Sequence, residues 1–348
     1  MPFKHLLVVL ILTLPLLSPV VLGSDVPDPL FQDDATLDVT LTAPLATLAR
    51  KRPTTNPLIG EFSFRQANGR RVWLDVEILS RGQSRHEYCD LPPMSLKFRK
   101  SQTDGTLFEQ ENEMKMVVHC DDSELYQQIV HRQFIAYRFL NALTDQSFRV
   151  RLLRVTYIDN EEERGEQVRY AFLIEDESRL ATRLGKKNIN IERTTVDAIQ
   201  PDQLNLTSMF QLLIGNTDFS VVDGGPDKEC CHNYVLLGND GEPQIAIPHN
   251  FDQSGLVNAP YAVPDEELYL QNVRQRYYRG WCKNNDYIEG SANRIRDASR
   301  AIFSLIYEQE GLEGVVNKSL VRYVENFYDI VDDPAGVKLK IIGRCQGY

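Results

Sequence analysis

The sequence predicts an α+β protein with two lobes, a small N-terminal lobe built on an antiparallel sheet and a larger, mostly helical C-terminal lobe. Alternating apolar residues and a hairpin signal dominate the first half of the chain, whereas apolar residues at helical spacing dominate the last third. The length of 348 residues suffices for two lobes that share a cleft. A ligand site between the lobes is therefore the default expectation.

The first predicted segment is residues 1–23. A basic start at Lys4 precedes an apolar run over 6–22 that two prolines interrupt, and the small residue Gly23 stands before Ser24. This pattern predicts a secretory signal peptide and hence a secreted or periplasmic protein. The alternative is an uncleaved membrane anchor.

The N-terminal lobe comes next. Its clearest element is a hairpin over 60–79 that turns at Asn68-Gly69, because Asn-Gly suits the tight turns of hairpins. The other elements are expected as strands at 36–45, 94–100 and 113–120, a helix at 124–143, and two strands around an acidic loop within 148–177. These elements divide the rest of the chain into three expected parts. They are an N-terminal extension with one strand at 24–58, a sheet-rich lobe with one helix at 59–178, and the helical lobe at 179–348.

The C-terminal lobe is expected to begin its helices near Pro201, with Gly215 ending the first of them. Further helices are predicted within 291–309 and 320–331 by the same spacing. Glycosylation sequons occur at Asn205 and Asn317, but such triplets also arise by chance.

Composition argues against two classes of partner. Hydrophobic residues make up 42% and charged residues 25% of the chain, as in ordinary globular proteins. The formal net charge is −11, so neither nucleic acid nor an anionic membrane would attract the protein electrostatically. We expect no nucleic-acid partner, no stable membrane insertion after signal cleavage, and an unknown protein or small molecule as substrate.

Six cysteines, an even number in an exported chain, predict disulfides. The favoured pair is Cys89 with Cys120, because both flank the same predicted region of sheet. The alternative is a zinc site, which no CxxC spacing supports. Its ligands would be Cys230, Cys231 and His232 with His119 and Cys120.

Polar residues interrupt the apolar segments between 212 and 256. Asp218 follows the first helix of the C-terminal lobe, Asn233 precedes an apolar strand, and Asn250 and Asp252 come after the returning strand. Protein kinases use this order for a catalytic Asp, a metal-binding Asn, a hairpin and a metal-binding Asp. The alternative is turn chemistry, since Asn, Asp and Gly are the usual turn residues.

Several motifs in the same order resemble the CotH kinase-like family. They are "RGQSR", "SLKF", "RYAFLIEDE", "HNYVLL" and "IPHNFDQSG", and the resemblance spans roughly residues 36–256. The "GNTD" stretch is also similar to the GN-x-D motif of secretory-pathway atypical kinases, and HipA-type kinases share the general motif order. The resemblance implies a two-lobed, atypical protein-kinase-like fold that uses ATP with Mg²⁺ or Mn²⁺ to phosphorylate a protein or a small hydroxyl substrate.

The resemblance also implies roles for individual residues. Asp218 is the implied catalytic base. Lys97 is the leading candidate to hold the nucleotide phosphates, and Lys115 is the second. The other implied residues are Arg81 and Arg85 facing phosphate, Glu175 beside the lysine or near the hinge, and Asn233, Asn250 and Asp252 at the metal.

Two departures from the family pattern put activity in doubt. Family members carry Asp directly after a Pro-Trp or Pro-Tyr pair, where this chain has His249 and Asn250. The helix at 124–143 offers no acidic partner for the lysine beyond Glu124. We therefore expect either a weakened phosphotransferase or, alternatively, a pseudokinase that serves as a non-catalytic binding or envelope protein.

Overall fold

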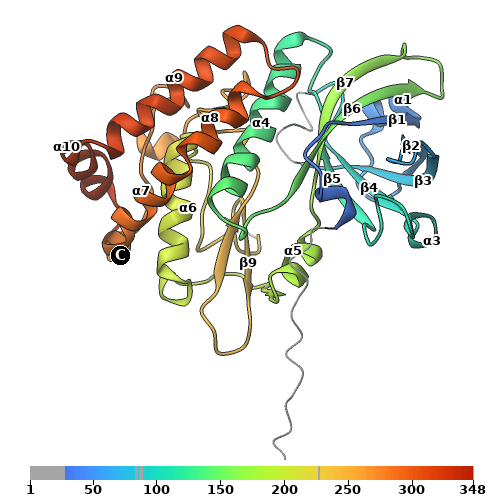
Figure 1. The fold of residues 1–348 in the computed structure, drawn as a ribbon. Helices are drawn as coiled ribbons and strands as arrows, with labels where there is room; N and C mark the ends of the chain where they lie inside the picture. Colours follow the sequence, from blue (N-terminus) through green and yellow to red (C-terminus); the bar gives the residue numbers. More distant parts are fainter. Residues whose placement is uncertain (1–27, 83–84, 86–88, 226–227, 348) are drawn as a thin grey trace, which may run out of the picture.

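A closed barrel of seven strands forms one side of the molecule, and most of the helices gather on the other (Figure 1). The computed structural model describes residues 28–82, 85, 89–225 and 228–347, so the expected signal peptide at 1–23 lies outside the described residues. Around the barrel the strands follow the order β1-β2-β3-β4-β5-β7-β6. Their bounds are β1 (Leu37–Ala43), β2 (Leu58–Arg65), β3 (Arg71–Ser80), β4 (Met94–Phe98), β5 (Glu113–Val117), β6 (Val150–Asp159) and β7 (Gln167–Ile174).

The predicted fold class is wrong. The N-terminal sheet is a closed, mixed barrel, because β1 pairs with β6 in parallel while its other neighbour, β2, is antiparallel. Helices make up only 37% of the structure, so the second half is not the mostly helical lobe of a two-lobed kinase-like fold. Residue alternation predicts strands and their buried faces, but the partner of β1 is more than a hundred residues away and leaves no local signal.

Strands β6 and β7 are buried on both faces where they meet the C-terminal half, over the first four residues of β6 and the last four of β7. In β6, Leu153 and Val155 point into the barrel, whereas Leu152 points outward into the helical core. In β7, Leu173 points inward and Phe172 outward. These two strands therefore join the barrel to the rest of the protein.

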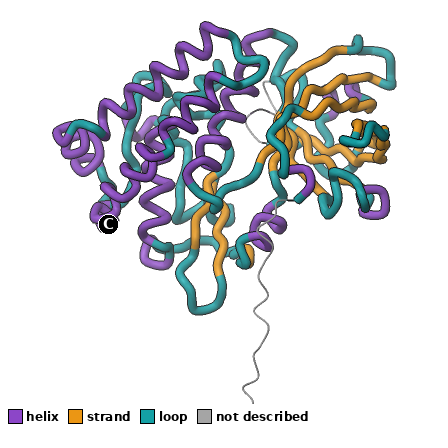
Figure 2. The backbone as a smooth tube through the Cα atoms, in the orientation of Figure 1, coloured by secondary structure: helices purple, strands orange, loops and turns teal. Residues whose placement is uncertain are grey.

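Helix α4 (Glu124–Leu143) has the bounds that the sequence predicted. It lies between the barrel and the C-terminal helices (Figure 2). Phe134 and Tyr137 each make an edge contact with Phe172 on β7. The predicted hairpin is confirmed as well, with β2 and β3 paired up to Arg65 and Arg71 and Gly69 at a φ of 81° in the turn.

The C-terminal half combines helices, a three-stranded sheet of order β10-β9-β8, and long loops. Its strands are β8 (Lys187–Asn188), β9 (Tyr234–Gly238) and β10 (Ile245–Pro248). Its helices are α5 (Glu177–Arg183), α6 (Pro201–Ile214), α7 (Ile288–Asp297), α8 (Ser299–Tyr307), α9 (Gly314–Val331) and α10 (Pro334–Gly336), and the short helices of the barrel side are α1 (Leu45–Lys51) and α3 (Lys100–Thr103). Within the described residues, no helix is both long and apolar enough to cross a membrane.

Neither glycosylation sequon presents a free asparagine amide. Asn205 is buried in α6 and donates to the Tyr278 hydroxyl and the Asn284 carbonyl. Asn317 in α9 donates to the Ile306 carbonyl at 2.8 Å. Both asparagine amides are therefore engaged within the folded protein.

The six cysteines form three disulfides. The predicted bond between Cys89 and Cys120 is confirmed, and the other bonds join Cys230 to Cys231 and Cys282 to Cys345. The zinc alternative finds no support, because these bonds occupy all the thiols that it needed.

We expect alkylation to label no cysteine in the untreated, denatured protein and all six after reduction. Mass spectrometry of the alkylated chain measures this directly. Labelling of any cysteine without reduction would contradict the three-bond pattern.

Candidate functional site

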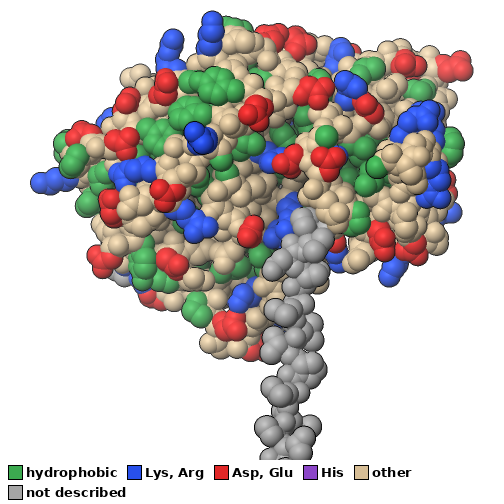
Figure 3. All heavy atoms as spheres, in the orientation of Figure 1, with side chains coloured by type: hydrophobic (Ala, Val, Ile, Leu, Met, Phe, Trp, Pro, Cys, Tyr) green, Lys and Arg blue, Asp and Glu red, His purple; other side chains and the backbone are tan. Residues whose placement is uncertain are grey.

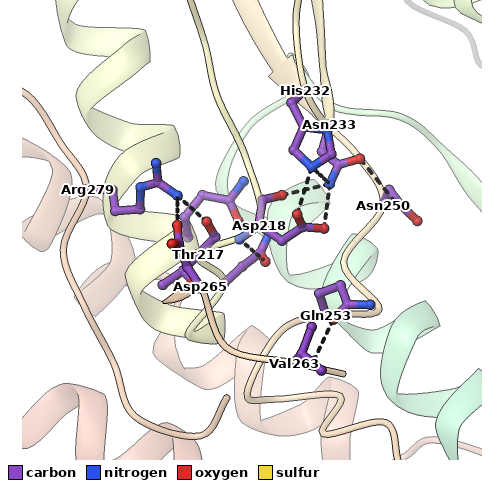
Figure 4. A network of polar contacts seen from close by, with 11 residues as sticks. Thr217, Asp218, His232, Asn233, Asn250, Gln253, Val263, Asp265 and Arg279 are labelled. Carbon is purple, nitrogen blue, oxygen red and sulfur yellow. Dashed lines mark hydrogen bonds and ion pairs between the residues drawn. The ribbon is translucent and has the colours of Figure 1, made fainter. Parts of the chain in front are cut away.

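A cleft of about 960 Å³ opens beside Asp218. Its walls come from segments that are far apart in the sequence, and Figure 4 shows several of them converging on Asp218. The loop after α6 supplies Thr217 and Asp218, the start of β9 supplies Asn233, and the chain after β10 supplies Asn250. The structure thus brings together three of the side chains that the sequence singled out.

The end of α6 sets the position of Asp218. Gly215 ends the helix at a φ of 62°, and an added Cβ there would lie only 2.0 Å from the Tyr323 hydroxyl oxygen. Asn216 then accepts a hydrogen bond from the Asp218 backbone N–H at 3.1 Å and donates to Gln211 at 3.0 Å. This turn holds Asp218 at the edge of the apolar core, where it is partly exposed to the cleft.

Both carboxylate oxygens of Asp218 are engaged. His232 Nε2 donates to Oδ1 at 2.7 Å, and Asn233 Nδ2 donates to Oδ2 at 2.9 Å. Asn250 Nδ2 in turn donates to Asn233 Oδ1 at 3.1 Å, so the four side chains form one continuous line (Figure 4). We name this row, His232–Asp218–Asn233–Asn250, the polar line.

Two members of the polar line have an unusual backbone. Asn233 and Asn250 lie in the left-handed region, at φ values of 57° and 60°. Asparagine enters this region more readily than most residues do. The backbone N–H of Asn250 also donates to the Tyr137 hydroxyl at 2.9 Å, which links this end of the line to helix α4.

Two contacts of this site were missed by the sequence reasoning. The sequence points to His232 only as a possible zinc ligand, although this histidine stands directly before Asn233 in the "HNY" motif. Arg279, a residue that the sequence does not single out, donates to the Thr217 carbonyl and lies 3.0 Å from Asp265 in the wall of the cleft (Figure 4). No local pattern marks Arg279, since both partners are distant in sequence.

The leading lysine candidate is not in the cleft. Lys97 points outward from β4, is exposed, and lies opposite Glu77 and Glu113 on the neighbouring strands. The second candidate, Lys115 on β5, also points outward, but toward α5, where it forms an ion pair with Glu177. Lys115 therefore contacts the C-terminal half of the chain, whereas Lys97 does not, and neither lysine lines the 960 Å³ cleft.

A second cavity, of about 490 Å³, lies beside Lys115. Its walls combine the start of β5 with the chain that follows β7, including Asp176, Glu177 and Ser178, and with Asn188 of β8. Polar side chains with both donors and acceptors line it.

Glu175 is not paired with a lysine. It is buried, and its two oxygens each accept a hydrogen bond of 2.8 Å from Arg183. One of them also accepts from the backbone N–H of Arg149 at 3.0 Å. This bidentate pair satisfies the carboxylate, so Glu175 ties β7 to α5 and takes no part in the cleft.

The two arginines of the "RGQSR" stretch differ in their partners. Arg85 is buried and lies 3.3 Å from Asp252, which is also buried. The other oxygen of Asp252, Oδ1, has no hydrogen-bond partner in the described part of the chain. Arg81 has no hydrogen bond or ion pair of its guanidinium to any described residue, and burial, followed by the charge of Arg85, lowers its pKa to about 10.

His249 is buried among basic side chains. Burial, followed by the nearby charges of Lys115, Arg81 and His232, holds its pKa well below the usual value. The imidazole is therefore neutral at physiological pH.

The side chains near Asp218 offer few free oxygens to the divalent metal that the resemblance implies. Asn233 Oδ1 accepts from Asn250, and the oxygens of Asp218 are both engaged. The buried Asp252 has its Oδ2 beside Arg85, whereas its Oδ1 has no partner among the described residues. Mg²⁺ in nucleotide sites is usually held by one or two carboxylates together with phosphate oxygens. No group of three or more His, Cys, Asp or Glu side chains among the described residues is arranged to hold a metal ion.

Comparison with known proteins adds no assignment to this geometry. A scan against protein-family models finds no match to the chain, and a search of curated proteins finds none either. A functional inference therefore rests on the geometry alone, namely on the cleft, the polar line and the nearby cations.

Proposed function

We propose that the protein is an exported phosphotransferase of low activity that binds a nucleoside triphosphate and a hydroxyl acceptor. The observation that carries the proposal is the polar line on the wall of the 960 Å³ cleft, with Lys115 and Arg81 near enough to the adjoining His249 to lower its pKa. A triphosphate lying against these cations would direct its terminal phosphate toward Asp218. The predicted signal peptide and the three disulfides support export.

Asp218 has the chemistry of a general base in this arrangement. The acceptor hydroxyl would lie in the cleft and pass its proton to an oxygen of Asp218 as its own oxygen bonds to the γ-phosphorus. The bond from that phosphorus to the bridging oxygen breaks, and a nucleoside diphosphate leaves. His232 and Asn233 orient the carboxylate through the hydrogen bonds described above.

The triphosphate would be neutralised by the barrel side of the site. Lys115 is about one third exposed and contacts Glu177, a partner that a phosphate could replace. The second cavity beside this ion pair offers space for the base and ribose. Arg81 supplies a further cation whose guanidinium makes no hydrogen bond or ion pair to a described residue.

A second candidate function is nucleotide binding without transfer. Asn250 favours it, because an amide brings no negative charge to the place where the resemblance expects a carboxylate. Stabilisation of charge that develops during transfer is usually a large contribution to catalysis. Loss of the carboxylate would therefore reduce the rate far more than the affinity for nucleotide.

Asn250→Asp distinguishes the two candidates. We expect the substitution to make nucleotide binding respond to Mg²⁺ or Mn²⁺ and to raise transfer by about tenfold or more, since a carboxylate joins the polar line. Titration calorimetry with ATP measures binding, and release of ADP with a generic protein or hydroxyl acceptor measures transfer.

The matched control is Asn258→Asp. Asn258 also lies in the left-handed region, at a φ of 50°, but outside the polar line. We expect this variant to behave like wild type. If neither wild type nor the Asn250 variant binds any nucleotide, the proposed function is wrong and the polar line serves only to stabilise turns.

A further inference from the structure

We infer that His232 is itself a phosphoryl acceptor, so that the protein phosphorylates its own histidine on Nδ1 when no hydroxyl acceptor occupies the cleft. This inference rests on the proposed function for its donor, a nucleoside triphosphate, and adds a covalent modification site to it. Three features of the histidine carry it, namely its hydrogen-bond partner, its exposure and its place in the wall of the cleft.

The Asp218 carboxylate fixes which ring nitrogen of His232 carries the proton. An ionised carboxylate only accepts hydrogen bonds, so Nε2, which lies 2.7 Å from Asp218 Oδ1, carries the proton. Nδ1 of the neutral ring then has a free lone pair. Asn233 in turn holds the other carboxylate oxygen at 2.9 Å. A nucleophile whose partner is oriented by a third group is the arrangement typical of covalent catalysis.

Nδ1 of His232 is open to solvent. It makes no hydrogen bond to a described residue, and it is not one of the buried nitrogens that lack a partner. The side chain is 43% exposed and lines the 960 Å³ cleft. His119 and His131 differ, because their rings are buried and their unpartnered nitrogens are closed off from solvent. A phosphoryl donor in the cleft therefore reaches His232 and not these two histidines.

The charges of the cleft wall are mixed. Lys228 and Arg279 line the cleft and offset part of the negative charge that a phosphoryl group brings. Two carboxylates of the same wall, Asp223 and Asp265, are paired with arginines at 3.1 and 3.0 Å, and Glu267 is exposed. The place is therefore marked by a reactive nitrogen and not by a net positive charge.

The phosphorylation step balances in atoms and electrons. The lone pair of Nδ1 forms a bond to the γ-phosphorus while the bond from phosphorus to the bridging oxygen breaks, and that electron pair leaves with the nucleoside diphosphate. No proton has to leave Nδ1, in contrast to a hydroxyl acceptor. The proton on Nε2 stays on the ring, and the Asp218 carboxylate offsets the positive charge that the ring gains.

The test exposes the full, oxidised protein to ATP labelled in its γ-phosphate, with Mg²⁺, and separately to phosphoramidate, a small donor that needs no nucleotide site. We expect both donors to place on His232 a phosphate that is lost in acid and retained in base, as a phosphorus–nitrogen bond requires. Mass spectrometry of peptides prepared at alkaline pH identifies the labelled residue.

Two variants test the chemistry. His232→Gln should lose the acid-labile label by about tenfold or more, since glutamine can still donate to Asp218 but has no nucleophilic nitrogen. Asp218→Asn should slow labelling of His232 by about tenfold with either donor, because the ring loses the carboxylate that orients it and offsets its charge.

His131→Gln is the matched control. Nε2 of His131 also lacks a partner, but the ring is fully buried on α4. This variant should be labelled at His232 like wild type, and thermal unfolding confirms that each variant is folded. Equal loss of label in both glutamine variants, or label on His119 or His131 of wild type at the rate of His232, would show that the assigned site is wrong.

The outcomes separate the inference from the proposed function. Label on His232 from both donors supports both. Label from phosphoramidate alone supports the reactive histidine and overturns the nucleoside triphosphate as the donor. Transfer from ATP to a hydroxyl acceptor, or acid-stable phosphate on Thr217 or Ser220, without label on His232 supports the proposed function and overturns the inference. Neither label nor transfer with either donor overturns both.

Discussion

Asp218→Asn is expected to reduce phosphoryl transfer by roughly a hundredfold to ten-thousandfold, the usual contribution of a general base. Nucleotide binding should remain within about twofold of wild type, since the base acts on the proton of the acceptor and not on the bound nucleotide. Asparagine keeps the shape of the side chain and can still accept from His232 or Asn233 through its oxygen. The expected signature is a loss in kcat with an unchanged ATP affinity.

Asp223→Asn serves as the control for this prediction. Asp223 lines the same cleft, but its carboxylate is paired with Arg193 at 3.1 Å. Removal of its charge should leave kcat within about threefold of wild type, as expected for a residue outside the reacting atoms. An equal loss of transfer in both variants would show that the rate depends on the general charge of the cleft and not on a base at position 218.

Glu111 is expected to make the protein less stable as the pH rises. Its side chain is fully buried before β5, and neither carboxylate oxygen has a hydrogen-bond partner among the described residues. Burial, followed by the charge of Asp28, raises its pKa to about 8, although Arg179 acts in the opposite direction. Glu111 therefore keeps its proton in the folded state up to a pH near 8, whereas in the unfolded state it loses the proton near the ordinary glutamate pKa of 4.5.

The direction of this change in stability with pH follows from the linkage between protonation and folding. The contribution of Glu111 to stability is complete below about pH 4.5 and is lost as the pH rises through about 8. Between about pH 5.5 and about pH 8.5 the loss is on the order of 3 kcal/mol. Glu111→Gln has a similar shape and does not ionise, so it should remove this loss.

Urea unfolding at the two pH values measures the effect. The quantity to compare is the change in unfolding free energy between them, in wild type and in Glu111→Gln, because other titrating groups contribute equally to both. Glu113→Gln is the control, since Glu113 lies two residues away and is exposed. An identical pH dependence in wild type and Glu111→Gln would contradict the raised pKa.

Part of the candidate site could be predicted from the sequence because its residues lie close to strands and turns that form locally. The end of α6 at Gly215, the hairpin of β9 and β10, and the residues that flank them place Asp218, Asn233 and Asn250 side by side. The order of these elements sufficed to place the three residues at one site. The sequence does not predict the contact of His232 with Asp218, because it depends on how two loops meet.

The ion pairs were the least predictable feature. Glu175 was expected beside a lysine, and it instead binds Arg183, which comes one short helix later. Lys97 and Lys115 have similar strand contexts in the sequence, and only the packing of the C-terminal half against the barrel distinguishes them. A charged side chain can pair with any opposite charge that lies close enough, and the fold decides which charges those are.

The sequence by itself determined the local elements of this protein, including α4, the β2–β3 hairpin and the end of α6, together with the approximate position of the polar line. The tertiary structure alone decided that the sheet closes through β1 and β6, which residues pair with Asp252 and Glu175, and that Lys115 pairs with Glu177 of α5. The physical reason is the range of the interactions. Periodicity and turn chemistry depend on neighbouring residues, whereas strand pairing and ion pairing depend on chain segments brought together only after the whole core has formed.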